Sequence, residues 1–169
     1  EGGYNVAVGY ASLDANTTGG SNTAVGYNSG GSITTGTQNT IVGALSGDAL
    51  TTGNNNSVLG YYALSAETQG DRNVAIGAFA LHNQNNTSDT DVYNIAIGYQ
   101  AGLSVTTGVR NVIVGGLAGD AFTTGNQNIA IGYNALSTED AGSYNVAIGG
   151  HALEAQDAGD IMTMPIFSA

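Results

Sequence analysis

The sequence predicts an all-β fold, a parallel β-solenoid (β-roll) of nine coils of about 17 residues each. An asparagine recurs at this spacing along most of the chain, and a glycine follows each asparagine four positions later. A fixed short period with an unvarying turn residue is typical of solenoids, in which each repeat forms one coil. No window shows a sustained helical period, and short strand-like runs separate the turn residues.

The repeats align on their leading asparagines and on the turn glycines. The asparagines are Asn5, Asn22, Asn39, Asn56, Asn73, Asn94, Asn111, Asn128 and Asn145. The glycines are Gly9, Gly26, Gly43, Gly60, Gly77, Gly98, Gly115, Gly132 and Gly149. Seven of the eight asparagine spacings are 17 residues, and the remaining one is 21. We therefore assign residues 1–160 to one solenoid domain, with the extra residues in an insertion loop at about residues 82–93.

Two neighbouring strand positions are apolar in every coil. Counted from the asparagine, position three always carries a large aliphatic residue, such as Val8, Ile76 or Ile131, whereas position two is often alanine. Because successive strand residues point to opposite faces, we predict that position three faces the coil interior. Position two would then form an outer apolar row, which calls for cover by further copies of the chain around a symmetry axis.

The rest of each coil shows a second short extended stretch, as at residues 10–13, and then a polar turn. Positions eight and eleven compensate in size. Where position eight is leucine, position eleven is polar, as in Leu136 and Glu139; where it is glycine, position eleven is apolar, as in Gly119 and Phe122. Since close-packed interiors keep a constant volume, this exchange predicts that both positions border one core.

Charge and composition exclude several classes of function. The formal net charge is −11, and Arg72 and Arg110 are the only strongly basic residues. Nucleic acids and anionic membrane surfaces are bound by clustered lysine and arginine, so we expect neither as a partner. There is no cysteine, which excludes disulfides and thiolate sites. No apolar run approaches the roughly 18 residues of a transmembrane helix, so we expect no membrane insertion in this segment.

Catalytic residues, cofactors and metal ligands are not predicted. His82 and His151 occupy different repeat positions, and none of the common catalytic or phosphate-binding motifs occurs. We expect that the protein is not an enzyme. Asp48 and Asp120 recur at position nine and leave calcium binding open, although a calcium site needs about six to eight converging oxygens.

Position five carries a tyrosine in five coils. The candidate receptor contacts are Tyr10, Tyr27, Tyr61, Tyr99 and Tyr133. Such rings can bind sugars or a protein receptor, and the alternative is that they cover the edge of the core and a subunit boundary. Paired threonines, such as Thr51 and Thr52 before Gly53, resemble the arrays of ice-binding proteins but also fit an ordinary polar turn.

The repeat Asn-x-Ala-Ile/Val-Gly-x-x-Ala resembles the head repeats of trimeric autotransporter adhesins, from Asn5 to about Gly159. Its longer form, with Tyr after the Gly and Thr-Thr-Gly in the turn, is similar to repeats of phage tail-fibre proteins, as in residues 123–136. The resemblance implies a left-handed parallel β-roll in a homotrimer, with a role in attachment and no catalytic residues. The coils of this chain are longer than those usual in adhesin heads.

Two functions stay open. One is a structural and adhesive module of a trimeric fibre, a stalk or head of a phage tail fibre or bacterial surface adhesin, extracellular and in contact with a glycan or protein receptor. The other is a monomeric surface solenoid whose flat face binds a glycan or ice. Because Glu1 falls in mid-repeat, we expect a piece of a longer protein. The apolar residues 161–169 are expected to cap the last coil or to begin the next segment.

Overall fold

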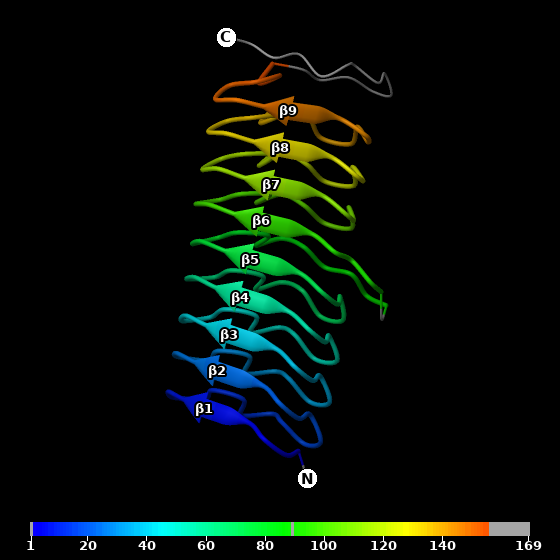
Figure 1. Ribbon diagram of the computed structural model, residues 1–169. Coiled ribbons are helices and arrows are strands. Elements are labelled where there is room, and N and C mark those ends of the chain that lie inside the picture. Colours follow the sequence, from blue (N-terminus) through cyan, green and yellow to red (C-terminus); the bar gives the residue numbers. More distant parts are fainter. Residues whose placement is uncertain (1, 89, 156–169) are drawn as a thin grey trace.

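The computed structural model describes residues 2–88 and 90–155, which form one continuous stack of coils (Figure 1). Each repeat contributes one strand of three residues. The strands are β1 (Val6–Val8), β2 (Thr23–Val25), β3 (Thr40–Val42), β4 (Ser57–Leu59), β5 (Val74–Ile76), β6 (Ile95–Ile97), β7 (Val112–Val114), β8 (Ile129–Ile131) and β9 (Val146–Ile148). They lie in chain order in one parallel sheet, which confirms the predicted β-solenoid.

Neighbouring strands pair in the register that the repeat predicts. Ala24 lies opposite Ile41, one repeat later, and the same shift holds along the sheet. The insertion between β5 and β6 leaves the register intact, because Val74 still pairs with Ile95. The extra residues extend sideways from the stack (Figure 1), and a parallel bridge joins Asp71 to Asp91 at the base of this loop. The predicted apolar cap, residues 161–169, lies outside the described residues.

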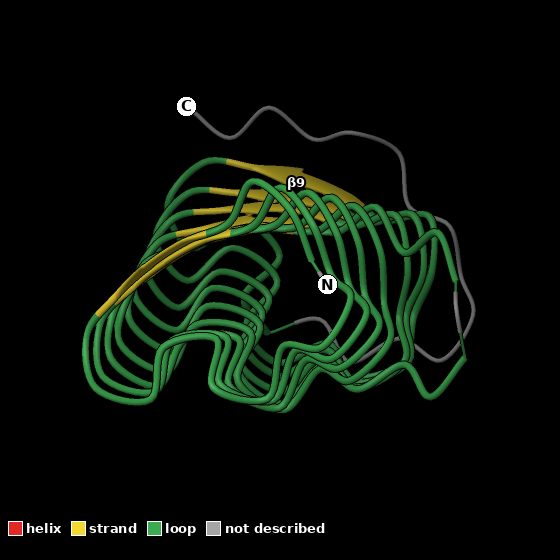
Figure 2. Cartoon of the chain, turned by 90° about the horizontal axis from the view of Figure 1, so that it is seen from below, coloured by secondary structure: helices red, strands yellow, loops and turns green. Residues whose placement is uncertain are grey.

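The core lies behind position two of the strands, so the prediction that position three faces inward was wrong. Position two is buried from β2 to β9, with Ala24, Ile41 and Ile113 fully buried. At position three, Val8 and Leu59 remain 57% and 50% exposed, and Ile76 and Ile131 are partly exposed. The outer apolar row is therefore position three, together with position one. Figure 2 shows the strands as one wall of the coil, with the turns closing the other sides.

Position two is mostly small because the opposite wall fills the interior. A Cβ added to Gly119 would lie 2.7 Å from ring atoms of Phe122, and one added to Gly30 would lie 3.0 Å from Cδ1 of Ile33. The apolar residue at position eleven thus occupies the space that a leucine at position eight takes in other coils. This confirms the predicted size exchange between positions eight and eleven.

Three of the polar residues at position eleven are buried as well, which their polar character does not predict. Glu67, Gln84 and Glu139 are completely buried. Oε1 of Glu67 accepts the backbone N–H groups of the next three residues at 2.9, 3.1 and 2.8 Å. Its Oε2 accepts the side-chain amides of Gln84 and Asn86. The carboxylate therefore satisfies the turn that in other coils surrounds an apolar residue.

The predicted second strand at residues 10–13 is wrong, because this segment is a turn. Ala11 and Leu13 have φ of 55° and 52°, and the equivalent residues of later coils share this left-handed conformation. Every turn glycine at position four also has positive φ, as in Gly132 at 133°. There a Cβ would collide with the carbonyl oxygen of Gly149 in the next coil, so glycine is needed for close approach as well as for conformation.

The leading asparagines form a buried ladder along the stack. Nδ2 of Asn39 donates to the carbonyl of Gly53, which closes its own coil, at 2.8 Å. Its Oδ1 accepts the backbone N–H of Asn56 in the next coil at 2.9 Å. The same two contacts recur in most coils, so the asparagine side chains satisfy buried backbone groups within and between coils, which explains why the repeat requires this residue.

Candidate functional site

The most extensive surface feature is the outer strand face, formed by positions one and three of the strands. All nine residues at position three and six of the nine at position one are aliphatic. Its members are Val6, Val8, Thr23, Val25, Thr40, Val42, Ser57, Leu59, Val74, Ile76, Ile95, Ile97, Val112, Val114, Ile129, Ile131, Val146 and Ile148. None is charged, and a continuous exposed apolar surface of this kind is typical of an interaction site.

The tyrosines of position five lie exposed along one edge of the stack, as their shared position suggests, with Tyr10 and Tyr27 at 78% and 55% exposure. These two rings stack on each other, with centroids 5.7 Å apart and planes inclined by 9°. Part of their ring surface is therefore already covered within the chain. Tyr99 and Tyr133 are exposed to a similar degree, at 55% and 54%.

Tyr61 belongs to an aromatic cluster that the repeat pattern does not reveal. Its ring meets those of Tyr62 and Phe79 edge-on, with centroids 4.5 and 5.6 Å away. Tyr62 and Phe79 stack on each other at 5.8 Å, and His82 contacts both rings edge-on. These partners occupy positions six and nine, where the other coils carry varied residues, so only the folded turn brings them together.

The position-nine aspartates Asp48 and Asp120 do not form a cluster of ligands. Burial raises the pKa of each carboxyl above the ordinary value of 3.8. Each has one oxygen, Oδ1, that is buried without a hydrogen-bond partner. No group of three or more acidic or histidine side chains converges anywhere in residues 2–88 and 90–155. Neither aspartate therefore has, within this part of the chain, the additional carboxylates that a calcium ion generally takes.

The threonines of the polar turn hold the coils together. Oγ1 of Thr51 donates to the carbonyl of Thr68 in the next coil at 2.9 Å, and Thr106 donates likewise to Thr123 at 3.0 Å. A hydroxyl engaged in this way cannot donate the same proton to ice or to a ligand. The first threonine of each pair is thus explained by coil stacking.

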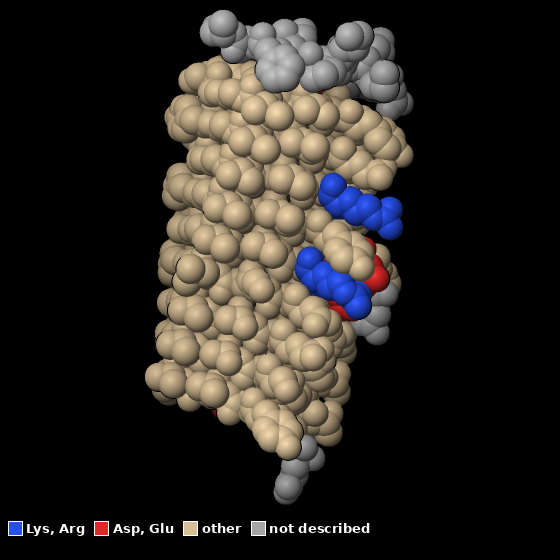
Figure 3. Space-filling model, viewed as in Figure 1, with Lys and Arg blue, Asp and Glu red and all other residues tan. Residues whose placement is uncertain are grey.

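A further row, which we name the outer ridge, consists of the residue immediately before each leading asparagine. It comprises Tyr4, Ser21, Gln38, Asn55, Arg72, Tyr93, Arg110, Gln127 and Tyr144. All nine are exposed and all have positive φ. The ridge contains both arginines of the chain and no acidic residue. The two arginines lie one above the other along one side of the stack (blue in Figure 3).

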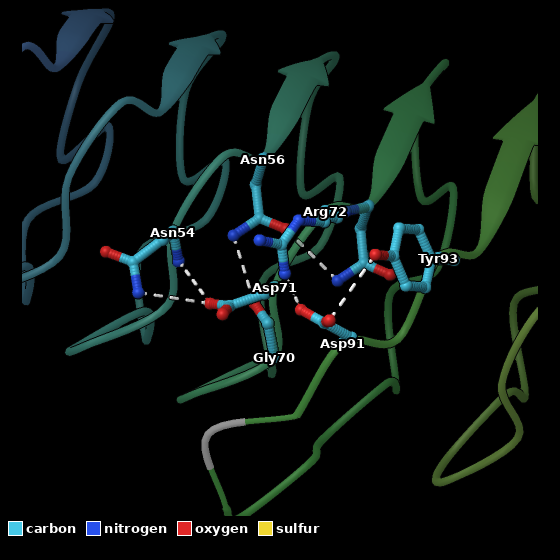
Figure 4. A network of polar contacts seen from close by, with 8 residues as sticks. Asn54, Asn56, Gly70, Asp71, Arg72, Asp91 and Tyr93 are labelled. Atoms are coloured by element: carbon cyan, nitrogen blue, oxygen red, sulfur yellow. Dashed lines mark hydrogen bonds and ion pairs between the residues drawn. The ribbon is translucent and has the colours of Figure 1, made fainter.

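A polar network at the base of the insertion fixes the middle of this ridge (Figure 4). The carboxylate of Asp91 pairs with the guanidinium of Arg72 through Oδ1 and accepts the hydroxyl of Tyr93 through Oδ2 at 3.3 Å. The guanidinium carbon of Arg72 lies 5.7 Å from the centroid of the Tyr93 ring. Asp71, which directly precedes Arg72, accepts the backbone N–H of Asn54 in the preceding coil at 2.6 Å. The insertion is thereby tied to the stack by polar contacts.

No helix in the part of the chain that the structure describes has the length and apolar character needed to cross a membrane. Comparison with known proteins adds no further assignment. No protein-family model, no curated protein and no solved structure matches the chain.

Proposed function

We propose that this chain is a structural module of a trimeric fibre, in which three parallel copies pack their outer strand faces around a common axis. The module serves as a stalk or head that holds an attachment site away from a phage particle or a bacterial surface, outside the cell. The observation that carries the proposal is the uncharged, largely aliphatic outer strand face, which runs along the full sheet.

The partner that fits the outer strand face best is another copy of the same chain. Because the strands are parallel and in register, a copy related by an axis along the stack presents a matching row at every level. The side chains are of similar size from coil to coil, which allows two such faces to pack closely. The number of three copies comes from the resemblance of the repeat to trimeric adhesin heads and fibre proteins.

Coil-to-coil contacts support a mechanical role. The asparagine ladder, the turn hydrogen bonds and the shared core link each coil to its neighbours in the stack. In repeat proteins of this kind stability is distributed along the stack, so a local opening exposes the interfaces of the adjoining coils. Such a rod is suited to bear load over its length.

The proposal is tested by placing a charge in the outer strand face. Val114→Asp would bury an unpaired carboxylate where the copies meet, which is strongly unfavourable. Thr124→Asp adds the same charge at an exposed turn position and serves as the matched control. Light scattering coupled to size exclusion should give the wild type and the Thr124→Asp variant a mass near three times 16.9 kDa, and the Val114→Asp variant a single-chain mass.

Far-UV circular dichroism of the same samples separates assembly from folding. The Val114→Asp variant should keep the β spectrum of the wild type, because Val114 lies outside the core. A wild type that remains monomeric, or a Val114→Asp variant that remains folded and trimeric, would overturn the proposal.

A further inference from the structure

The outer ridge has a composition unlike the rest of the surface. The chain carries 13 acidic residues and two basic ones, yet both basic residues and none of the acidic ones occur in this row. Left-handed backbone favours glycine or asparagine, but Arg72, Tyr93 and Arg110 adopt φ of 60°, 56° and 60° in three consecutive coils. These residue types are not explained by the backbone, which directs attention to what their side chains can bind.

Tyr93 is held in place from one side. Asp91 accepts its hydroxyl and pairs with Arg72, whose guanidinium lies over the ring. The tyrosine nevertheless remains 45% exposed. An aromatic ring fixed in this way presents an apolar surface with little loss of side-chain freedom on binding.

Arg110 stands next to Tyr93 in the following coil, where its backbone N–H donates to the carbonyl of Val92. Its side chain is exposed. Among the described residues, its guanidinium takes part in no ion pair or hydrogen bond, in contrast to that of Arg72. A guanidinium forms paired hydrogen bonds with a carboxylate, and it offers five donors in a fixed planar arrangement.

We propose that Tyr93 and Arg110 form a binding site for a sugar that carries one carboxylate, with Arg72 and Asp91 as positioning residues. The sugar ring packs against Tyr93, and its carboxylate accepts hydrogen bonds from Arg110. The net charge of −11 disfavours densely charged polyanions, whereas a ligand with one carboxylate meets little of that repulsion. This inference rests on the proposed attachment function and assigns a ligand class to it.

The test uses methyl galactosiduronic acid as the probe and its neutral methyl ester as the matched control ligand. Because the chain has only two arginines and no lysine, the guanidinium Nε–H region of a ¹⁵N NMR spectrum contains two signals to follow. Titration with the acid should shift the Arg110 signal, with a smaller change for Arg72. Titration with the ester should leave the Arg110 signal in place, and salt should weaken binding of the acid.

Arg110→Gln removes the charge at a position where glutamine is known to fit, since Gln127 occupies the same place in the next coil with φ of 56°. Affinity for the acid should fall at least tenfold in this variant. Gln38→Ser, a change on the same ridge four coils away, should leave the affinity unchanged. Equal binding of acid and ester, unmoved arginine signals, or undiminished binding by Arg110→Gln would overturn the site.

The mass of each sample, measured alongside, distinguishes this inference from the proposed function. A trimer that does not bind the acid contradicts the sugar site and leaves the fibre assembly standing. A monomer that binds the acid through Arg110 contradicts the assembly and supports the site.

Discussion

The size exchange between positions eight and eleven can be tested by moving one side chain across the core. Phe122→Ala removes the ring that fills the space next to Gly119, and Gly119→Leu introduces a leucine at that same space. The double variant Gly119→Leu with Phe122→Ala gives this coil the leucine at position eight that the next coil has in Leu136, with alanine at position eleven where the next coil has Glu139. The backbone at Gly119 already has the conformation that leucine adopts in the next coil, because Gly119 and Leu136 both have φ of 51°.

The structure sets the size of each effect. Phe122→Ala empties a fully buried site and should lower the free energy of unfolding by about 3–5 kcal/mol. Gly119→Leu alone overpacks the core, which should lower the free energy of unfolding by about 1–3 kcal/mol. It also places leucine in left-handed backbone, which should lower it by about a further 1–2 kcal/mol. The double variant retains mainly the backbone cost, so the two changes should couple favourably by the sum of the cavity and overpacking costs, at least about 4 kcal/mol. This exceeds the roughly 0.5–3 kcal/mol that is usual for contacting residues.

The assay is equilibrium unfolding in guanidinium chloride for the wild type, both single variants and the double variant, all at one protein concentration. Circular dichroism and tyrosine fluorescence should give coincident transitions, which would justify calculating the free energies of unfolding with a two-state model. A double variant whose destabilisation equals the sum of the single effects would refute the claim that positions eight and eleven fill one space.

Two further predictions concern the turns. Gly132→Ala should lower the melting temperature markedly, because Gly132 has φ of 133° and an added Cβ would collide with the carbonyl of Gly149. Gly116→Ala should have little effect, because no atom lies closer than 3.6 Å to an added Cβ there. Similar melting temperatures for the two variants would contradict the assigned role of Gly132. Asp120→Asn should raise the melting temperature at pH 7, because burial raises the pKa of Asp120 in the folded chain above its ordinary value of 3.8. The free energy of unfolding of the wild type is therefore unaffected by this carboxyl below pH 3.8, where it is protonated in both states, and falls as the pH rises through the raised folded-state pKa. The difference between Asp120→Asn and the wild type should disappear below pH 3.8, and a difference that does not vary with pH would count against this cause.

The repeat period predicts the coil count, the parallel register and the shared core of positions eight and eleven, because these depend on spacing and on volume. It could not decide which face of the strand is buried. Positions two and three are both apolar, so alternation alone assigns neither to the core, and the larger residues at position three suggested the wrong one. In the coils of Ala75 and Ala130 the interior accepts alanine at position two because Leu81 and Leu136 of the same coils fill it.

The candidate sites were less accessible to sequence reasoning. Ala11 and Leu13 adopt left-handed backbone although neither residue favours it, so the sequence predicts a strand where the structure has a turn. That turn brings Phe79 and His82 beside Tyr61 and Tyr62. The outer ridge could have been found by aligning the residues before each asparagine, but its exposure in every coil is a property of the folded turn. The candidate tyrosines of position five do lie exposed, and their role as receptor contacts remains a prediction.

Small-angle X-ray scattering of the wild-type chain tests the central claim, that copies associate side by side through the outer strand face. Lateral packing of three parallel rods predicts a forward-scattering mass near three times 16.9 kDa, with the length of a single rod and an enlarged cross-section. Association end to end would instead lengthen the particle at constant cross-section. Either that result or a single-chain mass at micromolar concentration would contradict the account.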